Sequence, residues 1–253
     1  MKQPGEGNAS EPDPVATLLD GAPGSDILLV ADHASNRVPP GIALGIAPDL
    51  LDTHIAIDIG SAALTRRLSA LLAAPACLAG ISRLVVDFNR DPAAPGVIPG
   101  ESDGHAIAGN QALSDAERVE RLNWHARYHR TIASLVRHAR LVVSVHSFTP
   151  RLASLPDQPR PWPVGILHNR DDRAARLALA AFDRLGIAAG DNQPYSGKIL
   201  NYTMDRHAEA TGTPYLGLEV RQDEIADDAG VERWAERLAP IIREVQERLT
   251  DRT

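Results

Sequence analysis

The sequence predicts an α/β fold in which a mostly parallel or mixed sheet lies between two layers of helices. The chain has 253 residues, which suits one large domain. Short runs of apolar and β-branched residues alternate with helical patterns, as in an open sheet covered by helices. The runs are apolar throughout, as expected for strands that are buried on both faces. We expect strands at residues 27–31, 84–88, 141–146, 164–167 and 215–220.

Helices are predicted where apolar residues recur at the 3.6-residue spacing of an amphipathic helix. Ser114 begins one of them and Glu117 follows three residues later, which is the pattern of a capping box. Val119 and Leu122 begin the apolar stripe of that helix. Gly186 is well placed to end the next helix. The four expected helices span residues 58–72, 114–136, 173–185 and 231–249.

The remaining segments define the domain organisation. Residues 1–25 are rich in glycine and proline and are expected to form a flexible lead-in, followed by a single domain at 26–253. Three long loops are expected within that domain, at 34–53, 90–113 and 186–202. Loops of this length in a compact domain usually carry function, so we expect them to surround the site.

Composition and charge exclude several classes of protein. The chain has 26 Lys and Arg against 33 Asp and Glu, a net charge of -7, and no basic block, which argues against a nucleic-acid partner. No apolar stretch is long enough to span a membrane, and the first 24 residues do not resemble a secretory signal. The single cysteine, Cys77, lies in an apolar stretch and is expected in the core. We therefore expect a cytoplasmic enzyme, with its oligomeric state open.

Polar residues follow the predicted strands at the edge where open α/β sheets bind their ligands. His33 and His146 each come at a strand end, and with one oxygen ligand they could form an open zinc site. Zinc lowers the pKa of a bound water to about 7. Glu219, within the last strand, could take a proton from that water and pass it to a leaving amine. The structural alternative for Glu219 is an ion pair with Arg221.

Other residues at this edge could bind a substrate. Arg90, with Asn89 beside it, could hold a carboxylate through two parallel hydrogen bonds, or could pair with Asp91 at the end of a strand. Arg83 could stabilise an oxyanion. Tyr195 begins a short segment that either closes over a ligand or forms an ordinary turn.

A pair of histidines four residues apart falls on one side of the 114–136 helix. His125 and His129 have this spacing, but the glutamate that would complete an HExxH zinc motif is absent. We therefore expect them in the core or behind the site rather than at a metal.

Four of these segments together resemble the N-formylglutamate amidohydrolase family, and the resemblance extends over residues 27–225. The segments are Asp-His-Ala-Ser-Asn at 32–36, Asp-Phe-Asn-Arg at 87–90, Val-His-Ser-Phe at 145–148 and Leu-Glu-Val-Arg-Gln-Asp at 218–223. The resemblance implies the fold of zinc carboxypeptidases and aspartoacylases, bound Zn²⁺ or another divalent metal, and hydrolysis of N-formyl-L-glutamate or another small acidic N-acyl amino acid. The 87–90 segment is similar to the element with which those enzymes hold a carboxylate.

The third metal ligand departs from the pattern of the zinc carboxypeptidases. Those enzymes use a His-x-x-Glu element, whereas here Asn36 stands three residues after His33. Asp58, at the start of the next helix, is the expected replacement; Asn36, another ligand or a site without metal are the alternatives. The alternative functions are hydrolysis of a longer acyl or peptide substrate, and a silent homologue that binds an acidic metabolite or a protein.

Overall fold

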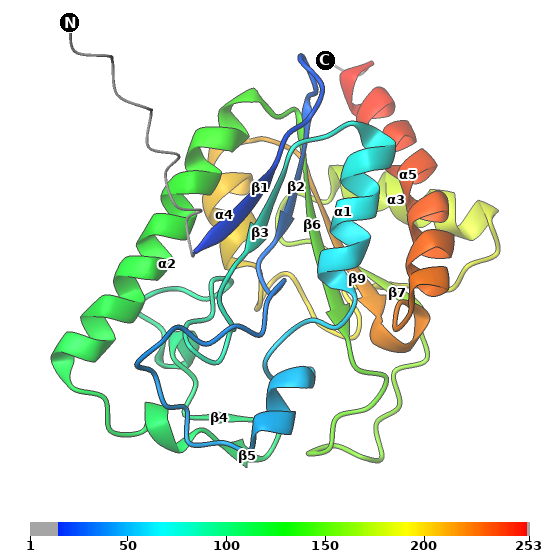
Figure 1. Ribbon diagram of the computed structural model, residues 1–253. Helices are drawn as coiled ribbons and strands as arrows, with labels where there is room; N and C mark the ends of the chain where they lie inside the picture. Colours follow the sequence, from blue (N-terminus) through cyan, green and yellow to red (C-terminus); the bar gives the residue numbers. More distant parts are fainter. Residues whose placement is uncertain (1–14, 252–253) are drawn as a thin grey trace, which may run out of the picture.

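The computed structural model describes residues 15–251 and shows a seven-stranded sheet between two helical layers (Figure 1). The predicted fold class is therefore confirmed. In the order β1-β3-β2-β6-β9-β7-β8, the strands are Ala16–Leu19, Ala76–Ala79, Ile27–Ala31, Leu141–Phe148, Tyr215–Arg221, Val164–Leu167 and Ala189–Asp191. The five main helices are α1 (Ser61–Leu72), α2 (Asp115–Leu135), α3 (Arg173–Arg184), α4 (Tyr202–His207) and α5 (Asp228–Thr250).

The sheet is mixed, with its parallel part in the middle. β3, β2, β6 and β9 run parallel, β1 pairs antiparallel with β3, and β7 pairs antiparallel with β9. Strands β6 and β9 have the longest register, from Val142 opposite Tyr215 to Phe148 opposite Arg221. This central pair brings His146 and Glu219 side by side, because they are partners in the register.

Two apolar clusters fill the spaces above and below the sheet. Side chains of α1, α3 and α5 pack with one face, and α2 and α4 cover the other (Figure 1). Successive strand residues alternate between the clusters, as with Leu29 on one side and Val30 on the other. Cys77 is fully buried, as expected. Within residues 15–251, no helix is both long enough and apolar enough to cross a membrane.

Most predicted elements are present with nearly the predicted ends. The Ser114 side chain accepts a hydrogen bond from the Glu117 backbone N–H at the start of α2. The Glu117 side chain accepts one from the Ser114 backbone N–H, which completes the capping box. Two predictions need correction. Residues 84–88 form turns rather than a strand, and the second parallel strand is β3, a few residues earlier. The predicted lead-in is wrong at Ala16–Leu19, which form edge strand β1 by pairing with β3. Residues 1–14 lie outside the described part of the chain.

The expected long loops contain further short elements. The 90–113 loop carries a hairpin of β4 (Glu101–Ser102) and β5 (His105–Ala106), and the 186–202 loop includes β8. These loops and the 34–53 loop surround the carboxyl ends of β2, β6 and β9, where the polar residues gather (Figure 1).

Candidate metal centre and binding pocket

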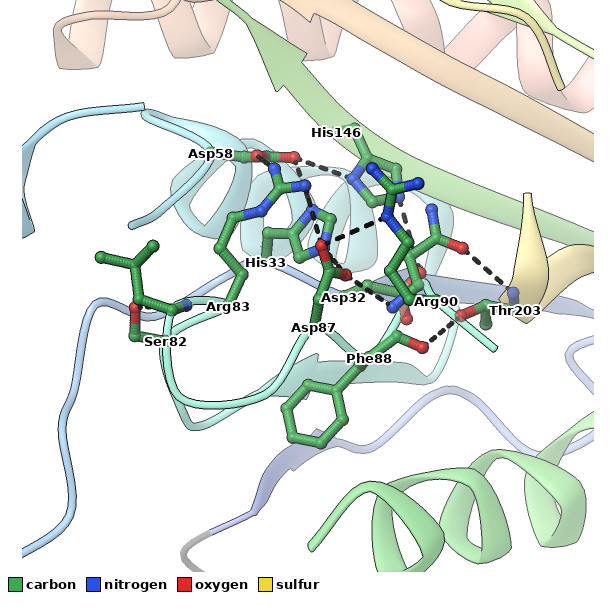
Figure 2. A network of polar contacts seen from close by, with 12 residues as sticks. Asp32, His33, Asp58, Ser82, Arg83, Asp87, Phe88, Arg90, His146 and Thr203 are labelled. Atoms are coloured by element: carbon green, nitrogen blue, oxygen red, sulfur yellow. Dashed lines mark hydrogen bonds and ion pairs between the residues drawn. The ribbon is translucent and has the colours of Figure 1, made fainter. Parts of the chain in front are cut away.

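His33, Asp58 and His146 come together at the carboxyl ends of the parallel strands (Figure 2). His33 follows β2, Asp58 precedes α1, and His146 lies within β6. The Asp58 Oδ2 atom is 2.8 Å from His146 Nδ1 and 3.3 Å from His33 Nδ1. All three side chains are buried, with about 5% of each residue exposed or less. One carboxylate oxygen and two imidazole nitrogens thus face a common point.

The backbone around Asp58 fixes its position in this cluster. The Asp58 backbone N–H donates to the His33 carbonyl oxygen at 3.0 Å, which ties the two loops together. Two residues later Gly60 has φ of +79°, in the left-handed region that favours glycine. A Cβ at Gly60 would lie 2.3 Å from the carbonyl oxygen of Ile225. The sharp turn that joins Asp58 to α1 therefore requires glycine.

Two further carboxylates orient the histidines from behind. His33 Nε2 donates to Asp87 Oδ1 at 2.8 Å, and His146 Nε2 lies 3.6 Å from Asp32 Oδ2. Each ring therefore presents its Nδ1 atom to Asp58 and its Nε2 atom to an outer acid. Carboxylates commonly support metal-binding histidines in this manner, because they fix the ring orientation and the tautomer.

The donor set fits a divalent metal such as zinc. The candidate ligand atoms of His33, Asp58 and His146 all lie within 4.8 Å of one another. Two nitrogens and one carboxylate oxygen, with a fourth position left open, is a ligand set that catalytic zinc sites use. A metal here would take the place of the proton that His146 shares with Asp58.

The electrostatics of the cluster favour charged partners. Burial alone would raise the pKa of Asp58, but the positive charge of His33 and the hydrogen bond from His146 hold it well below its usual value. Burial would lower the pKa of His146, but the nearby Asp32 carboxylate and the hydrogen bond with Asp58 raise it well above the usual value. A carboxylate that stays ionised is available to a cation.

Glu219 lies next to this cluster in the register of the central strands, opposite His146. The residue is 7% exposed, and its Oε2 atom has no hydrogen-bond partner among the described residues. Burial raises the pKa of Glu219 to about 7. A carboxyl group with this pKa can both accept and donate a proton near neutral pH. The structural alternative for Glu219, an ion pair with Arg221, is not formed, because Arg221 bonds to Asp223 and Glu224 instead.

Arg83 bridges two acids of the site. Its Nη1 atom donates to Asp58 Oδ1 at 3.1 Å, and its Nη2 atom donates to Asp87 Oδ2 at 3.0 Å (Figure 2). The pKa of Arg83 is raised by these two carboxylates in spite of its burial. Arg83 therefore couples the inner ligand Asp58 to the outer acid Asp87.

The segment with Asn89 and Arg90 is held in place through its backbone. His129 Nε2 donates to the Phe88 carbonyl oxygen at 2.9 Å, and His125 Nε2 donates to the Arg90 carbonyl oxygen at 2.9 Å. The side-chain oxygen of Asn89 accepts from the Thr203 backbone N–H at 3.0 Å. Its amide nitrogen is therefore left as a donor. Within residues 15–251, the side chain of Arg90 makes one long ion-pair contact, 3.8 Å from its Nε to Asp87 Oδ2.

These histidines belong to a polar face of α2 that is turned toward the site. Arg121 Nη1 donates to the Val85 carbonyl oxygen at 3.2 Å, and the Tyr128 hydroxyl donates to Asp32 Oδ1 at 2.9 Å. His129 also accepts a 2.9 Å hydrogen bond from His207 Nε2. Burial lowers the pKa of His129 to about 3, so the ring is neutral. The expectation that His125 and His129 lie behind the site is thus what the structure shows.

Hydrogen bonds to Asp103 join the 90–113 loop to the loop between β6 and β7. Asp103, at the tip of the β4–β5 hairpin, accepts from the backbone N–H groups of Ala153 and Ser154 at 2.9 Å each. It also accepts from His54 Nε2 at 3.0 Å. These bonds tie the hairpin to the loop between β6 and β7.

The polar residues line one pocket of about 130 Å³. Tyr195, from the loop between β8 and α4, closes one side of it, and its hydroxyl accepts from Arg160 Nη1 at 2.9 Å. All eight residues that the sequence pointed to as a site are in this pocket. The full lining is His33, His54, Asp58, Arg83, Asp87, Asn89, Arg90, His146, Ser147, Phe148, Thr149, Tyr195, Leu200 and Glu219.

The structure also separates the two proposed third ligands. Asn36 donates to Asp52 at 2.7 Å and is not part of the cluster, whereas Asp58 is at its centre. Sequence reasoning assigned no role to Asp32 or Asp87, although both stand in motifs that it singled out. The available signal for these two acids was their place in the motifs: one stands directly before His33, and the other stands two residues before Asn89.

Comparison with known proteins gives a family and two close folds. The family model described as N-formylglutamate amidohydrolase matches residues 25–226. Among curated proteins, none matches the chain. The crystal structure of gene product Atu2144 from Agrobacterium tumefaciens is similar over 93% of this chain and 96% of that one, with a TM-score of 0.88 and 30% identity. N-formylglutamate amidohydrolase from Ralstonia eutropha JMP134 has a TM-score of 0.73 and 19% identity, over 95% of this chain and 100% of that one.

Proposed function

Because this chain belongs to the N-formylglutamate amidohydrolase family, we propose that it is a metal-dependent hydrolase of small N-formyl or other N-acyl amino acids, such as N-formyl-L-glutamate. The observation that carries the proposal is the cluster of His33, Asp58 and His146 beside Glu219. The amide C–N bond would break, the acyl carbon would gain the water oxygen, and the products would be formate and the free amino acid.

The proposed metal ligands are His33, Asp58 and His146. A bound Zn²⁺ would lower the pKa of a water to about 7 and polarise the substrate carbonyl. Asp87 and Asp32 would hold the two imidazole rings so that their Nδ1 atoms stay directed at the metal. Support for this assignment comes from the geometry, because the three ligand atoms lie within 4.8 Å of one another.

Glu219 is the proposed general base and acid. Its unpartnered Oε2 atom would accept a proton from the attacking water and then deliver it to the amine nitrogen as the C–N bond breaks. The raised pKa of about 7 matches both steps at neutral pH. A buried carboxyl without a structural ion pair has no other evident role here.

Substrate binding is proposed for the remaining residues of the pocket. Arg90 and the Asn89 amide would hold a substrate carboxylate, and Tyr195 would bind the opposite end. Arg83 would stabilise the developing oxyanion while it keeps Asp58 in place.

The two alternative functions are less well supported. Pockets for drug-sized ligands measure roughly 300–1,000 Å³. The pocket here, about 130 Å³, favours a small substrate over a long acyl chain or a peptide. The presence of a full donor set together with Glu219 favours an enzyme over a silent homologue.

The first experiment measures formate release from N-formyl-L-glutamate by the purified protein with added Zn²⁺ and after chelation. We expect turnover that needs the metal, and a panel of formyl, acetyl and peptidyl substrates would give its range. Glu219→Gln is expected to keep its metal and lose turnover, while Glu236→Gln, exposed on α5, keeps both. An active Glu219→Gln variant would refute the role of this base. If no member of the panel is turned over, with or without metal, the proposal that this protein is a hydrolase is refuted.

A further inference from the structure

One guanidinium group beside the pocket has no carboxylate partner. Arg83 bonds to two acids and Arg90 has a long contact with one, whereas Arg160 forms no ion pair with any residue of 15–251. We propose that Arg160, acting through the hydroxyl of Tyr195, forms a second anion subsite that selects substrates with an acidic side chain. This inference rests on the proposed function, because it specifies the substrate of the same pocket.

Arg160 is bound to the pocket wall from behind. Its Nη1 atom donates to the Tyr195 hydroxyl oxygen at 2.9 Å and to the Thr149 carbonyl oxygen at 3.3 Å. Its guanidinium carbon lies 4.6 Å from the centroid of the Tyr195 ring, within the range of a cation–π contact. Tyr195 and Thr149 both line the pocket. The charge of Arg160 therefore lies one side chain away from a bound ligand.

The contact with Arg160 decides what the Tyr195 hydroxyl can do. Because the hydroxyl oxygen accepts from Arg160, its hydrogen is left for another acceptor, and no acceptor is found among residues 15–251. A substrate carboxylate is the strongest acceptor that could meet it. The nearby positive charge would stabilise that carboxylate more than in water, because the contact between Arg160 and Tyr195 is partly buried.

The chain holds this tyrosine close to the reaction centre. Gly165 on β7 pairs with Glu219 in the sheet, and a Cβ at Gly165 would lie 2.0 Å from the Gln193 carbonyl oxygen. Glycine thus lets the segment that carries Tyr195 pack directly against the sheet beside Glu219. The two loops that carry Arg160 and Tyr195 meet at this point.

Two anion subsites in one pocket define a class of substrate. One carboxylate of an N-acyl amino acid would bind Arg90 and Asn89, and the second would bind Tyr195 in front of Arg160. Asp58, Asp87 and Glu219 also line the pocket, so a second carboxylate needs a cation of its own to overcome their repulsion. A substrate with two carboxylates satisfies both subsites, and one with a neutral side chain leaves Arg160 without an anion.

The test compares kcat/KM for N-formyl-L-glutamate and N-formyl-L-glutamine, which differ in charge and little in shape. We expect the wild-type protein to prefer the glutamate substrate by at least about tenfold, the factor that one charge-assisted hydrogen bond supplies. In Arg160→Gln and in Tyr195→Phe the preference should fall to about one, while the zinc content stays the same. Arg160→Lys should keep part of the preference. Arg151→Gln, exposed on the same loop, is the matched control and should keep all of it.

The outcomes separate the subsite from the proposed function. Equal turnover of both substrates by the wild-type protein, or an unchanged preference in Arg160→Gln, overturns the subsite and leaves the hydrolase in place. Turnover of neither substrate, together with no turnover of the acetyl and peptidyl members of the panel, overturns the proposed function. In that case the Kd values of the same two compounds are measured by calorimetry on the zinc-loaded protein. Tighter binding of the glutamate compound supports the subsite if the Arg160→Gln substitution abolishes the difference. Equal Kd values for the two compounds refute the subsite.

Discussion

Replacing His129 with glutamine is expected to make the folded protein less sensitive to acid. His129 is 1% exposed, and it bonds to the Phe88 carbonyl oxygen and to His207. Burial, the neighbouring His125 and His207 all lower its pKa, against a smaller opposing effect of Asp32, to about 3. Glutamine can place its amide N–H where the Nε2–H of the ring was, but it does not titrate.

The expected effect follows from the difference in the protonation of His129 between the folded and the unfolded chain. At pH 5.0 a histidine of the unfolded chain, with a usual pKa of about 6.5, is almost fully protonated, whereas folded His129 stays neutral. The unfolded state then binds more protons, so stability falls as the pH drops below 6.5. Linkage gives a loss of about 2 kcal/mol in the free energy of unfolding between pH 7.5 and 5.0 from this residue, and about 5 kcal/mol once the pH is below 3.

The assay is urea denaturation of the wild type and of His129→Gln at pH 7.5 and 5.0. Other groups titrate in both proteins and cancel in the comparison. The difference between the pH-dependent loss of stability in the wild type and that in the variant therefore gives the contribution of His129. We expect the variant to lose about 2 kcal/mol less than the wild type over this interval. His138→Gln, which removes an exposed histidine just beyond α2, should show the wild-type loss. Equal losses in wild type and His129→Gln would show that His129 is not held neutral, and would refute the reasoning.

Three other changes test the metal centre and its loops. Asp58→Asn is expected to abolish stoichiometric zinc binding, measured by atomic emission after gel filtration, whereas Asn36→Ala keeps it; zinc retained by Asp58→Asn would contradict the ligand assignment. Asp87→Asn should weaken zinc affinity by about 10- to 100-fold in a competition titration, because His33 loses the carboxylate that orients it, and an unchanged affinity would argue against that role. Asp103→Ala should cost roughly 1–3 kcal/mol in urea denaturation and speed proteolytic cleavage between β6 and β7, because two backbone N–H groups lose their acceptor. Cleavage at the wild-type rate would show that the hairpin does not restrain this loop.

The strands of the sheet were predictable where they are fully buried and long enough to form a continuous apolar run. Residues 84–88 have the same apolar, β-branched composition, yet they form turns. Val85 and Val86 bond back to the Ser82 carbonyl oxygen, and side chains of Asn110 and Arg121 satisfy the carbonyls of Leu84 and Val85. Those partners come from 25 or more residues away. A local pattern therefore shows that the segment is buried but not how its backbone is bonded.

The helix α2 shows a similar limit. Its capping box and length were predictable, but its apolar stripe predicted the buried side only toward the C-terminal end, where Ile132 and Val136 are buried, since Val119 is 56% exposed. The rest of the buried side carries Arg121, His125, Tyr128 and His129. Polar residues at these positions become intelligible only when the carbonyl groups they bond to are known.

The candidate site was predictable to the extent that it follows strand ends. His33, His146 and Glu219 could be placed together because parallel strands bring their carboxyl ends to one edge. The position of Asp58 depends on the turn at Gly60, and the local pattern indicated only that a helix begins nearby. Asp32, Asp87 and Arg160 contact residues that are distant in sequence, so these partners could not be inferred from spacing.

The polar face of α2 also limits how far this protein can be stabilised without harm. Apolar side chains of similar volume at buried polar positions often raise stability, because they remove a desolvation cost. At His125, Tyr128 and His129 the same exchange would release the Phe88–Arg90 backbone and Asp32. The two carbonyl oxygens and the Asp32 carboxylate would then stay buried without a donor, which costs roughly 1–3 kcal/mol for each group. Apolar replacement on this face of α2 is therefore expected to lower stability, so this usual route to a thermostable variant is closed here.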